Sequence, residues 1–156
     1  MAVVDEKTKK ELKKEIARLM KIPGKSRTAI LRSHIIAIRF KEGEGGVRKV
    51  EELMKELGYP INLSKIGVFG WEKDSWPIAV GLVAAKIFGW TDKDVFELGE
   101  LAVKRSLLAK ITLRHFLSPK KAFKEAPRLW KKYYNFGKLE PVEFNEKEKY
   151  LSLIHI

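Results

Sequence analysis

The sequence predicts an α+β protein that is mostly α, with about six helices followed by the start of an antiparallel sheet. Apolar residues recur at intervals of three and four over most of the chain, as on the buried side of a helix. Glycine or proline stands where several of these runs stop. From Leu139 onward the pattern changes to the alternation that is typical of strands.

The first two helices are predicted from residues that are typical of helix ends. Thr8 and Glu11 have the spacing of a capping box and begin a first helix, which stops before Pro23. We expect Ser26 to cap a second helix, whose apolar side ends at the glycines of residues 43–46.

The middle of the chain contains a third helix, a loop and a central helix. Residues 47–57 have helical spacing and are closed by a glycine. Residues 61–72 have no clear period and predict a loop from which Phe69 points inward. Pro77 is expected at the first position of the next helix, which is apolar nearly all round and therefore central.

Two further helices are predicted before the sheet. Thr91 and Asp94 repeat the capping pattern and begin a long helix to Leu117. Pro119 begins a second, amphipathic helix, in which Pro127 is expected to cause a kink or a break.

The end of the chain predicts a β-hairpin with a turn at residues 145–148. Because a lone hairpin is only marginally stable, we expect the sheet to continue in a longer protein and this chain to be truncated at its C-terminus. The last six residues, LSLIHI, look like a translated sequencing-library adapter, and the alternative is a natural strand end, which Leu, Ile and His would suit. The expected organisation is an N-terminal helix and linker at 1–25, a single helical domain running into a truncated sheet at 26–150, and a non-native tail at 151–156.

Composition restricts the class of protein. The 156 residues suit one domain, and the formal net charge of +12 favours acidic partners. The absence of cysteine excludes disulfides and thiolate metal sites. The start of the chain lacks the apolar segment of a signal peptide, and the longest apolar run, residues 76–90, is shorter than the ~20 residues of a membrane span. We therefore expect a cytoplasmic protein that is not transmembrane.

Positive charge is concentrated in residues 104–138, which contain eleven Lys and Arg residues against one acid, Glu125. At 100° per residue, the cations of the amphipathic helix fall on one side and its apolar residues on the other. A Lys-rich face of this kind often does no more than contact water, and an anionic partner is the alternative. The candidate contacts are Lys120, Lys121, Lys124, Arg128, Lys131 and Lys132.

Several segments together resemble the haem-nitric-oxide-binding and four-vinyl-reductase-like superfamily over roughly residues 27–149. They are the Gly-Glu-Gly-Gly segment at 43–46, ELGYP at 56–60, Trp-Pro at 76–77, FELG at 96–99 and EAPRLWKKYYxxG at 125–137. The resemblance implies a helical half followed by an antiparallel sheet, as in small-molecule sensor domains and in distant relatives that act as vesicle-tethering subunits. It also implies a pocket for a small apolar ligand between the helices and the sheet, and a homodimer or partner domain in the complete protein.

Haem-binding members of that superfamily carry an axial histidine on the helix before the sheet. Here this helix, residues 127–136, has no histidine, so the resemblance implies no haem ligation at that position. His34 and His115 lie on other predicted helices, where a lone histidine is more often a packing residue than a ligand. The sequence nominates no catalytic, metal-binding or cofactor-binding residue, and enzyme activity is unsupported.

Two functions therefore compete. One is a non-enzymatic small-molecule-sensing or adaptor domain. The other is a protein that binds nucleic acid or another anionic surface through the basic helix at residues 119–136.

Overall fold

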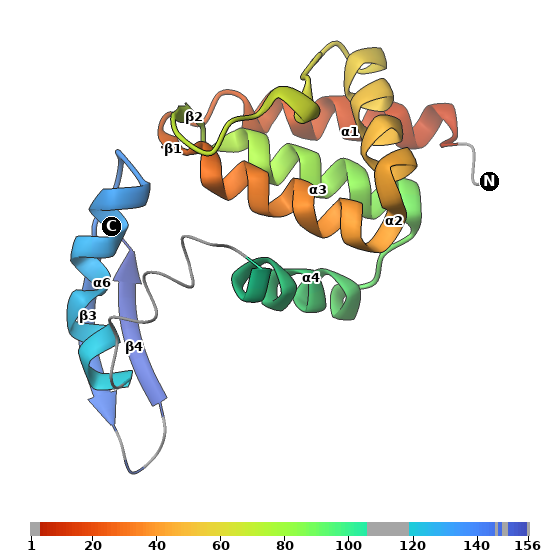
Figure 1. Ribbon diagram of the computed structural model, residues 1–156. Coiled ribbons are helices and arrows are strands. Elements are labelled where there is room, and N and C mark those ends of the chain that lie inside the picture. The colour runs from red at the N-terminus through yellow and green to blue at the C-terminus, as the bar shows by residue number, and fades with distance from the viewer. Residues whose placement is uncertain (1–3, 106–118, 146, 148–149, 156) are drawn as a thin grey trace.

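The computed structural model describes residues 4–105, 119–145, 147 and 150–155. Within them the chain is mostly helical with two small antiparallel sheets, which confirms the predicted α+β class (Figure 1). The helices are α1 (Glu6–Leu19), α2 (Thr28–Glu56), α3 (Ser75–Phe88), α4 (Asp92–Arg105) and α6 (Pro119–Tyr133), with a 3₁₀ turn, η1 (Leu63–Lys65). The strands are β1 (Lys25–Arg27), β2 (Trp71–Lys73), β3 (Leu139–Asn145) and β4 (Tyr150–His155).

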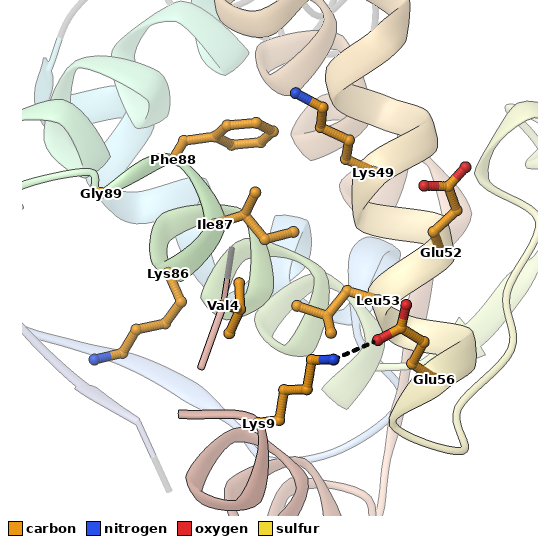
Figure 2. A pocket seen from close by; sticks show the side chains of 10 residues that line it. All are labelled: Val4, Lys9, Lys49, Glu52, Leu53, Glu56, Lys86, Ile87, Phe88 and Gly89. Carbon is orange, nitrogen blue, oxygen red and sulfur yellow. Dashed lines mark ion pairs between the residues drawn. The ribbon is translucent and has the colours of Figure 1, made fainter. Parts of the chain in front are cut away.

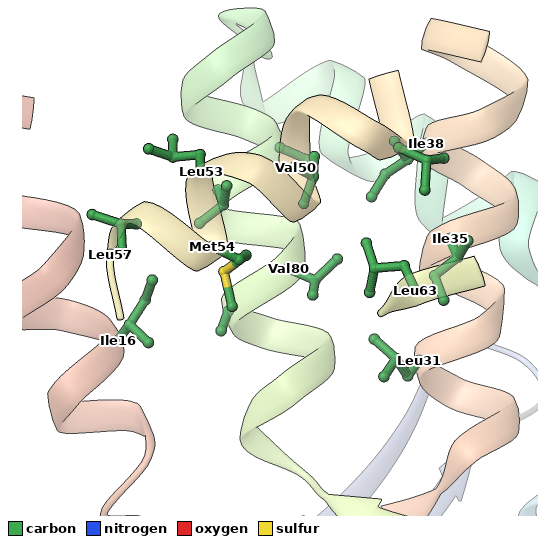
Figure 3. Close-up of a cluster of buried hydrophobic side chains, with 14 of the residues drawn as sticks. Ile16, Leu31, Ile35, Ile38, Val50, Leu53, Met54, Leu57, Leu63 and Val80 are labelled. Carbon is green, nitrogen blue, oxygen red and sulfur yellow. The ribbon is translucent and has the colours of Figure 1, made fainter. Parts of the chain in front are cut away.

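The hydrophobic core lies among α1, α2 and α3, with η1 closing one side (Figure 3). Ile16 of α1, Met54 of α2 and Val80 of α3 are completely buried at its centre. Each comes from the apolar side of an amphipathic or wholly apolar helix, which is why the sequence period locates this core. The other large buried side chains are Leu12, Leu31, Ile35, Ile38, Val47, Val50, Leu53, Leu57, Leu63 and Val83.

Helix α2 spans two of the predicted helices. It continues from Thr28 to Glu56 but bends at Gly43, where φ is 71° and ψ is −174°. A left-handed φ of this kind favours glycine, which explains why the Gly-rich segment changes the direction of the helix. The predicted interruption is thus a sharp kink.

Several predicted helix ends differ from the structure. Asp5, and not Thr8, caps α1, because its carboxylate accepts a hydrogen bond from the Thr8 backbone N–H at 2.7 Å. Ser26 caps no helix, since it is buried in β1 and α2 begins two residues later. Pro77 is the third residue of α3, in the first turn, where a missing N–H is tolerated.

The other predictions give a mixed outcome. Phe69 does not point inward, because its side chain is 89% exposed. Thr91 and Asp94 do form the predicted reciprocal cap of α4. Helix α6 continues through Pro127 without a break. The stretch expected to extend the preceding helix to Leu117 lies outside the described residues, as does His115.

The predicted hairpin is confirmed as β3 and β4, which pair antiparallel with an irregularity after Pro141. Residues 151–155, expected to belong to a non-native tail, supply most of β4. No helix of the described residues combines the length and the apolar character needed to cross a membrane.

Candidate polyanion-binding surface

Helix α6 holds all six sequence-predicted cations on its exposed side. We call this set, Lys120, Lys121, Lys124, Arg128, Lys131 and Lys132, the basic face, and every member is exposed. Glu125 forms an ion pair with Arg128 at 3.3 Å and so offsets part of one charge. The structure therefore places together the cations that the 100° spacing predicted.

The opposite side of α6 holds the helix in place. It packs against β3, and Leu129, Trp130, Tyr133 and Tyr134 are half-buried there and in the turn that follows. The Trp130 ring stacks on Tyr134 with centroids 4.0 Å apart, and its indole N–H donates to the Phe136 carbonyl at 2.8 Å. Burial raises the pKa of the Tyr134 hydroxyl, and the Asp74 carboxylate adds to this.

The end of α6 meets the two-stranded ribbon formed by β1 and β2 (Figure 1). The Lys25 backbone N–H donates to the Asn135 side-chain oxygen at 2.6 Å, and the Asn135 N–H donates to the Lys25 carbonyl at 3.1 Å. The Arg27 Nε donates to the Lys132 carbonyl at 3.2 Å. These hydrogen bonds bring Lys25 and Arg27 beside the basic face.

Sequence reasoning missed the ribbon's contribution to this surface. Its cations are Lys25, Arg27 and Lys73, and they adjoin Trp71 on the same two strands. Strands of three residues are too short to show a period, and the β1 residues that contact the end of α6 are more than a hundred positions from it in the sequence. The one available signal was the short alternation of charged residues in Lys-Ser-Arg at 25–27, which residues 71–73 do not repeat.

An open pocket of about 630 Å³ lies at the other end of the helical bundle, near the N-terminus (Figure 2). Val4, Leu53, Ile87 and Phe88 form its apolar part. Lysines and glutamates surround them, including Lys9, which pairs with Glu56 at 3.0 Å. This pocket is a different site from the one predicted between the helices and the sheet.

His34 is placed as a packing residue. Its Nδ1 lies 3.0 Å from the Ile30 carbonyl oxygen one turn earlier, and its ring faces Gly81 of α3. Among the described residues, no group of three or more His, Asp or Glu side chains is arranged to hold a metal ion.

Comparison with protein-family models, curated proteins and solved structures finds no match to this chain. The family resemblance of the sequence therefore stays a prediction, and the functional argument depends on the surface itself.

Proposed function

We propose that this protein is a non-enzymatic, cytoplasmic adaptor domain that binds nucleic acid through the basic face of α6. The observation that carries the proposal is the exposure of six cations on one side of a single helix, with one acid among them. Residues 120–132 cover about 18 Å along the helix axis at ~1.5 Å per residue. That length matches about five phosphates of one strand at ~3.4 Å each.

The packing of α6 favours nucleic acid over a lipid bilayer. A helix that binds at a membrane surface buries its apolar side among the acyl chains. The apolar side of α6 already packs against β3, and Trp130 and Tyr134 are engaged in ring contacts there. The exposed cations lie on the other side of α6, which suits a phosphate backbone.

The proposal is tested by the salt dependence of binding to a short duplex, measured by fluorescence anisotropy. Each phosphate contact contributes a slope of about 0.9 in a plot of log affinity against log salt. We expect the triple variant Lys124→Gln, Arg128→Gln and Lys131→Gln to flatten this slope by about two to three units. The slope should flatten by slightly less than three full phosphate contacts would give, because Glu125 already offsets part of the Arg128 charge.

A matched control removes the same charge elsewhere. Lys7, Lys10 and Lys14 are exposed on one side of α1, so changing all three to Gln lowers the net charge equally. We expect this control to leave the slope within half a unit of wild type, as a rough criterion. Equal slopes in wild type and the α6 variant would refute the proposed function.

A second candidate function, the sensing of a small ligand, is supported by the pocket of about 630 Å³ with Ile87 and Phe88 in its apolar part. Binding of a neutral apolar dye should weaken several-fold in Ile87→Gln, because a polar amide replaces apolar lining. The α6 triple variant should bind the dye like wild type. Dye binding unchanged by Ile87→Gln would remove this pocket as the sensing site.

A further inference from the structure

The outer face of the β1–β2 ribbon combines positive charge with an aromatic ring. Lys25 lies opposite Lys73, and Arg27 lies opposite Trp71. Opposed residues of an antiparallel pair share one face, and so do residues two apart on a strand, so these four side chains share a face. Ser26, between Lys25 and Arg27, points to the other face and is 1% exposed.

Arg27 connects the aromatic ring with the basic face. Its guanidinium lies 4.3 Å from the centroid of the Trp71 ring, within cation–π range. Its Nε is fixed on the Lys132 carbonyl of α6. Trp71 nevertheless keeps 37% of its surface exposed. The indole is thus held in place at the border of the basic face.

Phe69, two residues before Trp71, adds a second exposed ring. The intervening Gly70 has φ of 148°, and its carbonyl accepts a hydrogen bond from the Thr28 N–H at 3.2 Å. This φ disfavours any residue other than glycine, and a Cβ at Gly70 would also lie 3.2 Å from the Thr28 Cγ2, which is a tight contact. This contact fixes the backbone between the two aromatic residues.

Single exposed aromatic side chains are common, but two rings beside three cations have a specific use. Single-stranded nucleic acid exposes its bases, and proteins bind it by combining a positively charged surface with aromatic rings on which bases stack. Duplex bases are already stacked on one another and present only their edges in the grooves. Exposed rings beside cations, such as Trp71 on the ribbon and Phe69 just before it, therefore suit a single strand better than a duplex.

We propose that Phe69 and Trp71 stack on the bases of a single-stranded nucleic acid whose phosphates lie along the ribbon cations and the basic face of α6. This inference rests on the proposed function and specifies its substrate class. The proposed site should bind single strands of any base sequence, because every base has an aromatic face.

The test uses the full chain with a single-stranded oligonucleotide, an abasic strand of the same length and a duplex. We expect Phe69→Ala to weaken single-strand binding roughly ten-fold, with the salt slope and the duplex affinity unchanged. Phe69→Tyr keeps the ring and should bind like wild type. Trp71→Phe should lose less affinity than Trp71→Ala, because it keeps an aromatic face beside Arg27.

Phe96→Ala is the matched control, since Phe96 is 72% exposed on α4, away from the ribbon. Phe96→Ala should leave the single-strand affinity, the duplex affinity and the salt slope unchanged. In wild type, the abasic strand should bind at least ten-fold more weakly than the intact strand.

The outcomes separate this inference from the proposed function. If Phe69→Ala and Trp71→Ala each change single-strand affinity less than about two-fold while the α6 triple variant still flattens the slope, stacking is refuted and polyanion binding stands. If wild type binds only anionic vesicles, or neither nucleic acid nor vesicles, both proposals are wrong.

Discussion

The contact of Gly24 with Phe136 is the sharpest point at which to perturb the connection between the helical bundle and α6. Gly24 has φ of 115°, a conformation that L-residues rarely adopt. An added Cβ would lie 2.4, 2.7 and 2.9 Å from the Cδ1, Cγ and Cε1 atoms of the Phe136 ring. Ordinary carbon contacts are ~3.5–4.0 Å, so Gly24→Ala requires the ring to retreat by about 1 Å.

Two effects contribute to the loss of unfolding free energy that we expect in Gly24→Ala. Holding alanine at this φ costs on the order of 1–3 kcal/mol. Moving the Phe136 ring weakens its edge contacts with Trp130 and Tyr134, whose centroids lie 6.2 and 5.7 Å away. Aromatic pairs of this kind contribute ~0.5–1.5 kcal/mol each. We expect a total destabilisation of about 2–6 kcal/mol, concentrated at the junction between β1 and the end of α6.

Hydrogen exchange measures the destabilisation at this junction, because the Lys25 and Asn135 backbone amides donate the two hydrogen bonds that join β1 to the end of α6. Both amides should exchange faster in Gly24→Ala, while amides in the core of α2 keep their protection. A double-mutant cycle with Phe136→Ala separates the two effects, since removing the ring removes the overlap but leaves the backbone strain. Unchanged exchange, with a free energy of unfolding within about 0.5 kcal/mol of wild type, would refute the reasoning.

Two further predictions concern the bundle. Hydrogen bonds from Lys41 and then Thr91 hold the pKa of the Asp94 carboxyl well below its ordinary value, so its contribution to stability is present above about pH 4 and is lost as the pH falls. The urea midpoint should therefore fall less between pH 5 and pH 2 in Asp94→Asn than in wild type, and equal falls would contradict this. Met54→Ala should lower the free energy of unfolding by about 2–5 kcal/mol, because Met54 is completely buried. Phe96→Ala should lower it by less than about 1 kcal/mol, because Phe96 is exposed. Similar losses in both variants would show that the core is misassigned.

The sequence predicts those parts of the fold whose signals are local. The apolar periods of α1 and α6, the all-round apolar character of α3, and the reciprocal cap of Thr91 and Asp94 depend on residues within a few positions of one another. The antiparallel hairpin is likewise a short-range pairing. These elements were predicted for that reason.

The errors arise where tertiary contacts override a local signal. Ser26 has the chemistry of a helix cap, yet pairing with Glu72 in the ribbon places it inside the protein. Phe69 is apolar, yet Gly70 fixes the backbone so that the ring faces solvent. Neither outcome can be read from neighbouring residues, because β1 and β2 are separated by the whole of α2.

The same distinction applies to the candidate surface. The basic face lies on one helix, so the 100° rule was enough to identify it. Its extension depends on Arg27 reaching the Lys132 carbonyl and on Asn135 pairing with Lys25, contacts between residues more than a hundred positions apart. Periodicity carries no information about such contacts.

The opposed lysines of the ribbon support the proposal of an anionic partner. Lys25 and Lys73 lie directly opposite each other, and like charges in that position destabilise an antiparallel pair. The Lys73 ammonium is partly satisfied by the Met20 carbonyl at 3.2 Å, but a carbonyl does not cancel its charge. A phosphate beside the two lysines would remove their repulsion and gain two charge-assisted hydrogen bonds. Under the proposed function, this pair of opposed lysines is therefore expected to favour binding of a phosphate backbone.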